Sequence, residues 1–181
     1  AIATPDGERR VEHLRIGDRV LTGDGRAVPA RWIGRQTVSM RFQMPERLLP
    51  VRIRAGALGN GLPARDLTLT ADHALLIDGL LINAGALVNG STIDWVPVGE
   101  IGDSLTVYHV ETEDHDIILA EGTPSETFID FGGRRAFDNF DEYIALYGAE
   151  RTILEMRYPR VSARRLVPPS LKERLAAPKV A

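Results

Sequence analysis

The chain of 181 residues contains no cysteine. The residues given can therefore form no disulfide, hold no thiolate-bound metal and supply no cysteine nucleophile. No apolar run approaches the ~18 to 20 residues of a membrane-spanning helix, and no segment at the start has the order of a secretory signal. Hydrophobic residues make up 44% and charged residues 26%, as in a soluble globular protein. We expect one domain with an appendage and no membrane span.

The charge is unevenly distributed along the chain. Residues 151–181 carry eight Lys or Arg and two Glu, a balance of +6, which leaves −9 for residues 1–150. Nucleic-acid or anionic-membrane binding would require an aromatic or amphipathic pattern that this basic arm does not show. We expect the arm to lie across the acidic body or to be solvated, and we expect no nucleic-acid partner.

Short apolar stretches separated by turn residues fill the first 130 positions, and they predict an all-β fold. The group GDG at 23–25 predicts a β-hairpin, and Asp78-Gly79 predicts a two-residue turn within ALLIDGLLI. The segment LTVYHVETEDHDIILAEG, 105–122, alternates on both sides of an acidic turn at 113–114 and predicts a further hairpin.

Helical patterns occur only after residue 138. Asp138 is expected to cap a short helix, FDEYIALY, that ends at Gly148, and Ser170 with Glu173 has the spacing of a capping box. Prolines and arginines between these two helices indicate an extended strap. We therefore predict a β domain at 1–131 and, at 132–181, a basic helical and extended C-terminal extension packed on it.

The stretch LTLTADHALLI, 67–77, places a histidine inside a strand-like pattern. Side chains alternate between the two faces of a strand, so Thr70 and His73 can address one group only if the chain turns at Ala71-Asp72. Such a turn would direct a hydroxyl, an imidazole and backbone N–H groups toward one peptide bond. A protonated imidazole can donate a proton to a leaving amine while other donors stabilise an oxyanion. Acyl transfer requires both kinds of group.

Three other histidines need an interpretation. His109 and His115 are expected on the two strands of the last hairpin, and His109 is a candidate second acid or base. Metal binding by His73, His109 and His115 with nearby aspartates, and a purely structural role for all three, are the alternatives left open by spacing alone. His13, in an exposed-looking segment, is expected to have no role.

Three ordered blocks resemble the hedgehog/intein autoprocessing domain, also called the Hint domain, in its bacterial form. IATPDGERRVEHLRIGDRVLT resembles the first block, and LTLTADHALLI resembles the Thr-x-x-His block with Thr70 and His73 in the matching places. YHVETEDHDIILAEG resembles the late block, where His109 takes the place of a catalytic Asp of inteins and His115 that of the late-block histidine.

The resemblance implies a horseshoe-like all-β fold, no cofactor and no bound metal. It also implies single-turnover cleavage in cis of the chain's own upstream peptide bond, with Thr70, His73, His109 and His115 as site residues. A Cys or Ser would attack the preceding carbonyl, and the resulting (thio)ester would then be resolved. A monomeric domain of a secreted or cell-surface bacterial protein is expected.

Three departures from the family pattern restrict this expectation. The family nucleophile stands about six residues ahead of the Ile of IATP, so the residues given lack it and are inactive as they stand. The place of the terminal His-Asn of inteins reads TPSETF at 123–128, so full splicing is not expected. ARWIGRQTV at 30–38 has no acid where hedgehog proteins activate a sterol. The rival reading is a non-catalytic β-module that keeps the fold as a folding or interaction domain.

Overall fold

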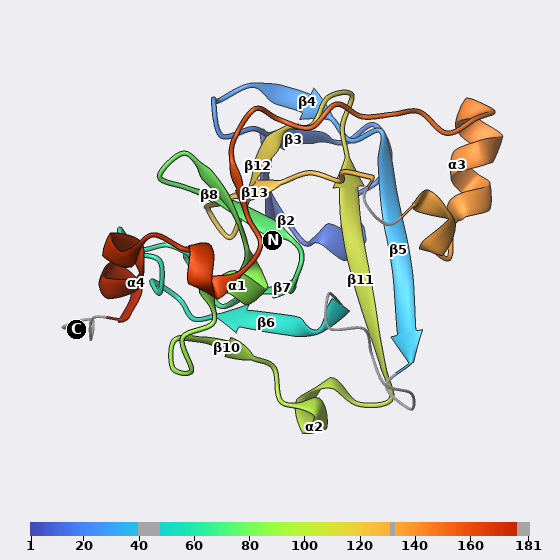
Figure 1. Ribbon diagram of the computed structural model, residues 1–181. Coiled ribbons are helices and arrows are strands. Elements are labelled where there is room, and N and C mark those ends of the chain that lie inside the picture. Colours follow the sequence, from blue (N-terminus) through green and yellow to red (C-terminus); the bar gives the residue numbers. More distant parts are fainter. Residues whose placement is uncertain (40–47, 131–132, 177–181) are drawn as a thin grey trace.

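The computed structural model describes residues 1–39, 48–130 and 133–176 (Figure 1). Short strands dominate it, and together they confirm the all-β fold class. Their bounds are β1 Ile2–Thr4, β2 Gly7–Arg9, β3 Arg19–Leu21, β4 Ala27–Pro29, β5 Trp32–Ser39, β6 Pro50–Ile53, β7 Leu67–Thr70, β8 Ala74–Ile77, β9 Leu80–Asn83, β10 Ile93–Trp95, β11 Ser104–Glu111, β12 Ile117–Ala120, β13 Thr123–Glu126 and β14 Arg160–Val161. The α-helices are α1 Ala84–Leu87, α2 Val98–Ile101, α3 Phe140–Tyr147 and α4 Pro169–Ala176, and the 3₁₀ turns are η1 Val11–His13, η3 Arg134–Ala136 and η4 Arg164–Leu166.

The strands form four sheets, and their order brings together distant parts of the sequence. The largest sheet has the order β14-β9-β8-β13-β12-β1-β2, and the smaller ones are β10-β6-β7, β11-β5 and β3-β4. Because β1 pairs with β12, the start of the chain lies beside residue 120, and Ile2 is opposite Ala120. The extension joins the same sheet, since β14 runs parallel to β9.

The two hairpins with the strongest turn signals are confirmed. β3 and β4 pair around the segment 23–25, and β8 and β9 pair with Ile77 opposite Leu80. Asp78 and Gly79 both have positive φ, 50° and 77°. These are the dihedral signs of the two-residue turns that match the twist of paired strands.

The hairpin predicted for 105–122 is wrong. β11 pairs along its whole length with β5, from Ser104 opposite Ser39 to Glu111 opposite Trp32, while β12 pairs with β13 and β1. The segment between β11 and β12 turns inward instead of joining them in one ladder, because the hydroxyl of Thr127 accepts the backbone N–H of Asp116 at 2.9 Å. His115 therefore lies in a buried loop and not on a strand.

The predicted helices exist, but their caps differ from the prediction. Asn139, not Asp138, is the N-cap of α3, and the Asp138 carboxylate accepts the backbone N–H of Thr37 instead. The end of α3 at Gly148, which adopts the left-handed conformation, is confirmed. α4 already begins at Pro169, so Ser170 lies in its first turn and cannot serve as the cap of a capping box.

Two of the hydrophobic clusters contain most of the buried apolar side chains that join the domain to its extension. The larger lies among the main sheet, the β10-β6-β7 sheet and α1, and Leu171 and Leu175 of α4 are part of it. The smaller, called the aromatic cluster below, lies between β5 and α3 on the opposite side of the molecule (Figure 1). It consists of Trp32, Phe128, Phe137, Tyr143 and Ile153.

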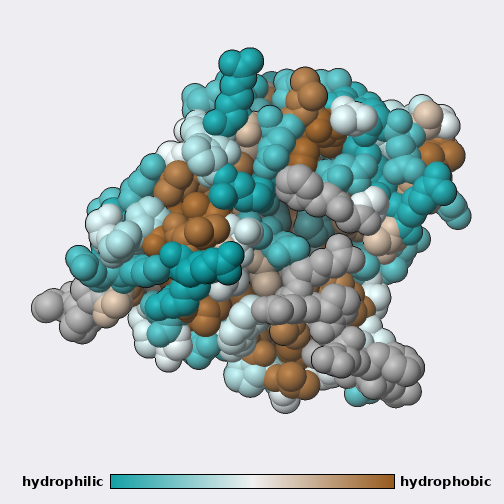
Figure 2. All heavy atoms as spheres, viewed as in Figure 1, coloured by the Kyte–Doolittle hydropathy of each residue, from teal (hydrophilic) through white to brown (hydrophobic). Residues whose placement is uncertain are grey.

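Hydrophilic residues cover much of the face seen in Figure 2, and hydrophobic residues form separate patches on it. The large hydrophobic side chains that are most exposed lie on different elements. They include Leu154 at 85%, Val98 of α2 and Leu146 of α3. In the described part of the chain, no helix has the length and apolar character needed to cross a bilayer.

Candidate active site at the Thr70–His73 turn

The chain turns sharply between β7 and β8, as the sequence predicts. The backbone N–H of His73 donates to the carbonyl of Thr70 at 3.1 Å, and the carbonyl of His73 accepts from Ala84 at 2.9 Å. The carbonyl of Ala71 accepts from Gly85 at 2.9 Å. These bonds allow Thr70 and His73 to line the same hollows, which a continuous strand would prevent.

Two hollows meet at this turn, and Thr70, His73 and His109 line both. The smaller, of about 100 Å³, also has Phe128, Phe137 and Asp72 in its wall. The larger, of about 550 Å³, contains Ala1 and Ile2 and runs along β7 and β11. The three candidate side chains that the sequence places far apart are therefore brought together beside the first residues of the chain.

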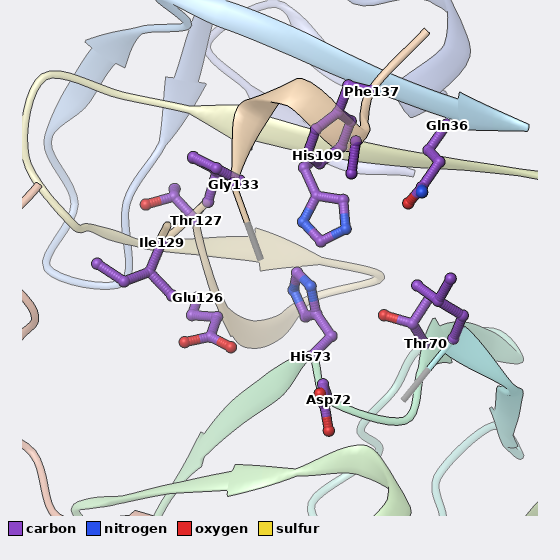
Figure 3. A pocket seen from close by; sticks show the side chains of 13 residues that line it. Gln36, Thr70, Asp72, His73, His109, Glu126, Thr127, Ile129, Gly133 and Phe137 are labelled. Atoms are coloured by element: carbon purple, nitrogen blue, oxygen red, sulfur yellow. The ribbon is translucent and has the colours of Figure 1, made fainter. Parts of the chain in front are cut away.

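The two imidazoles face each other across the smaller hollow (Figure 3), with ring centroids 5.7 Å apart. His109 projects from β11 and is packed edge to face against Phe137 at 5.3 Å and Phe128 at 6.0 Å. Phe137 can approach this closely because β5 has Gly34 opposite His109, where a side chain would collide with the Phe137 ring. The aromatic cluster thus forms one wall of the site.

Burial controls the protonation of both rings. Burial first, and then the neighbouring His73, lower the pKa of His109 to about 3, although Glu126 opposes them. Burial also lowers the pKa of His73, although the charge and the backbone oxygen of Glu126 oppose this. Both imidazoles are therefore neutral near pH 7, and each can accept a proton as well as pass one on.

Sequence analysis missed Glu126, the last residue of β13, which stands at the centre of a polar network. Its carboxylate accepts the backbone N–H of Ala74 at 2.7 Å and is held by both terminal nitrogens of Arg160, at 2.7 and 3.2 Å. Burial would raise the pKa of Glu126, but hydrogen bonds from His115 and Arg160 lower it to about 2. Glu126 is therefore a carboxylate at neutral pH, directly behind the turn that carries His73.

The fourth candidate, His115, lies behind Glu126 and lines neither hollow. Its Nδ1 accepts the backbone N–H of Met156 at 3.1 Å, so the proton of the neutral ring is on Nε2. That nitrogen lies 3.4 Å from a carboxylate oxygen of Glu126. His115 therefore approaches the site through Glu126, and it also lowers the pKa of His73.

The remaining candidates are separate from these hollows. His13 is exposed on η1. Among the described residues, no three His, Asp or Glu side chains lie close enough to hold a metal ion. No geometry supports the alternative in which His73, His109 and His115 share a metal with nearby aspartates.

The chain is similar to a known domain family and to solved structures of inteins. The family model described as "Hint domain" matches residues 1–132. The crystal structure of the MchDnaB-1 intein is similar, with 15% identity, a TM-score of 0.48, and coverage of 68% of this chain and 93% of that one. A second is the Msm DnaB1 intein splicing domain bound with zinc, with 12% identity, a TM-score of 0.46 and the same coverage. A search of the curated proteins gives no match. The family match spans most of the chain, and the protein belongs to the Hint domain family.

Proposed function

We propose that this domain cleaves, once and in cis, a peptide bond upstream of Ala1. A Cys or Ser that precedes Ala1 would attack the carbonyl carbon of the residue before it, and the ester or thioester formed would then be hydrolysed. The proposal includes no metal and no cofactor, and its substrate is the upstream polypeptide of the same secreted or surface protein. The observation that carries it is the common hollow shared by Ala1, Thr70, His73 and His109.

The position of the chain start supports cleavage at this place. Ala1 and Ile2 line the larger hollow, and the Ala1 carbonyl accepts the backbone N–H of Glu121 at 2.8 Å. A segment that precedes Ala1 would therefore begin at the hollow that the two histidines also line. A short upstream segment of about six residues spans at most ~20 Å when extended, so it can fold back into the hollow.

The first step would be an acyl shift from nitrogen to oxygen or sulfur. The side-chain heteroatom forms a bond to the carbonyl carbon while its proton passes to His73, which is neutral near pH 7. The C–N bond then breaks, and the same proton goes from His73 to the departing amine nitrogen. Thr70 would donate its hydroxyl hydrogen to the oxyanion of the tetrahedral intermediate.

The second step would release the upstream segment. A water molecule attacks the ester carbonyl, and His109 accepts a proton from it. The bond to the Cys or Ser side chain breaks, the side chain regains a proton from His109, and the upstream segment leaves with a new carboxylate. Because the pKa of His109 is about 3, its protonated form is a strong acid that gives its proton back quickly.

Mass spectrometry of the protein expressed with its native upstream residues tests the proposal. We expect release of the upstream segment at the predicted junction, faster with added thiol, and loss of release in His73→Ala. His13→Ala is the matched control because His13 is exposed and outside the hollows, and it is expected to cleave at the normal rate. An intact precursor in the unmutated protein, or an inert residue in place of the nucleophile, would favour the non-catalytic module instead.

A further inference from the structure

The segment that follows the family match reaches into the site. The match ends at residue 132, yet Phe137 packs on His109, the backbone of Met156 holds His115, and Arg160 holds Glu126. Arg160 comes from β14, which is added to the edge of the main sheet beside β9. The extension thus supplies contacts to His109, His115 and Glu126.

The ion pair of Glu126 and Arg160 is bonded to the residues on both sides of His73. The Glu126 carboxylate accepts the N–H of Ala74, the residue directly after His73. Arg160 donates to the side-chain oxygen of Asn83 of β9 at 3.3 Å. The amide of Asn83 in turn lies 3.5 Å from the carboxylate of Asp72, within the turn. Figure 3 shows Thr70 and Glu126 on either side of His73.

We propose that Arg160 and Glu126 are positioning residues of the site, and that their ion pair fixes the Thr70–His73 turn and balances the charge beside the His73 ring. This extends the proposed function, on which it rests, to residues beyond the matched domain. Neither residue is a proton-transfer group, because the guanidinium does not deprotonate and the carboxylate is already bonded on both oxygens.

The charges that face His73 act in opposite directions. Glu126 raises its pKa, whereas Arg160 and His115 lower it, and His109 faces it across the hollow. Removing the positive charge alone must therefore raise the pKa of His73, and removing the negative charge alone must lower it. Removing both charges returns it toward the original value, a pattern that a loss of packing does not produce.

The test is an NMR titration of the histidine ring nitrogens in the chain of residues 1–181. We expect Arg160→Gln to raise the pKa of His73, Glu126→Gln to lower it, and the double variant to lie between them. Arg160→Lys, which keeps the charge, leaves it near the original value. Arg157→Gln, an exposed change in the same extension, is the matched control and shifts nothing. The exposed His13 serves as an internal reference in every spectrum.

Two outcomes overturn the inference: shifts of the same sign in both single variants, or a His73 pKa that does not respond to either. If Arg160→Gln does not fold, the other two variants still test the inference. Arg160→Lys must leave the pKa of His73 unchanged, and Glu126→Gln must lower it.

Cleavage of the protein with its upstream residues is measured in parallel, and Arg160→Gln is expected to slow it on the order of 100-fold, as for a misplaced catalytic group. Failure of the unmutated protein to cleave contradicts the proposed function but leaves the titration readable. Normal cleavage by the unmutated protein, together with a His73 pKa that does not change in the variants, contradicts only this inference.

Discussion

A fully buried ion pair and a partly buried one join the extension to the β domain, and they differ in their surroundings. Arg134 and Glu111 are 2.8 Å apart with side chains 0% exposed, and the guanidinium lies over the rings of Phe128 and Tyr143. Arg160 and Glu126 are 2.7 Å apart, and Glu126 lines the hollow that His73 also lines.

The first pair is enclosed by aromatic rings, whereas the second lies among groups that titrate. Arg134 is absent from the groups that shift the pKa of His73, and Arg160 is one of them. The same pair of residue types can therefore hold the extension in place at one point and set the electrostatics of the site at another. Measurements of stability and of protonation separate these two roles.

The largest effect on stability is expected from breaking the aromatic-enclosed pair. Arg134→Leu leaves the carboxylate of Glu111 buried without its partner, which typically costs about 3–5 kcal/mol. Urea unfolding of the chain of residues 1–181 measures it. The matched control is Arg135→Leu, because the Arg135 side chain is 80% exposed and its pair with Glu150 contributes about 0–1 kcal/mol. A normal stability in Arg134→Leu would mean that this pair does not hold the extension.

A substitution in β5 is expected to change both the stability of the protein and the pKa of His109. In Gly34→Ala, the added Cβ meets carbons of Phe137 and Trp32 at 2.8 Å, so Phe137 must move away from His109. Overpacking of this kind costs roughly 1–3 kcal/mol. We also expect a higher pKa for His109, since burial opposes its protonation and the ring becomes less buried. Gly99→Ala is the control because nothing lies within 4 Å of its Cβ, and it should leave both the unfolding midpoint and the NMR titration unchanged.

The histidine pair predicts a specific dependence of stability on pH. The pKa of His109 is about 3 in the folded protein, whereas an unfolded histidine has a pKa of about 6.5. Between these pH values the unfolded state therefore binds more protons than the folded state. Proton binding to His109 in the unfolded state thus lowers the free energy of unfolding as the pH falls from about 6.5 to 3. The slope of the unfolding free energy against pH is proportional to the number of protons taken up on unfolding. His109→Gln should reduce that number by up to about one in this window. An unchanged slope would contradict the burial of the ring.

The smallest effect is expected at the surface of the extension. Arg174 of α4 pairs with Asp78 at 2.7 Å, and both side chains are about half exposed. Such pairs contribute about 0–1 kcal/mol, so Arg174→Gln should change the unfolding free energy by less than about 1 kcal/mol and leave His73 unaffected. A larger loss would show that charge pairs of the extension stabilise it even when solvated.

Local sequence patterns predict those parts of the fold that interactions between neighbouring residues determine. Asp78-Gly79 supplies the positive φ of a tight turn, and the Thr-x-x-His spacing requires the bend that the structure contains. Alternation of apolar residues predicts that β11 and β12 are strands, but it does not say which strands pair. β11 pairs with β5, about 70 residues away.

The same limit explains which site residues the sequence reveals. Thr70, His73 and His109 carry the resemblance to a known family, so their types and order are readable. Glu126 is a charged residue at the end of β13. It is buried because β13 lies between β8 and β12 and because Arg160 of β14 pairs with it. Arg160 resembles the other arginines of the basic arm, and only the path of the extension selects it.

Trapping the acyl intermediate tests the central claim most directly. Hydroxylamine attacks esters and thioesters much faster than amides, so it intercepts an acyl shift but not a direct hydrolysis of the peptide bond. The protein with its native upstream residues, treated with hydroxylamine, is predicted to release an upstream segment that ends in a hydroxamate, and His73→Ala is predicted to release none. A released segment that carries only a carboxylate at high hydroxylamine, or equal release from both proteins, would contradict the account.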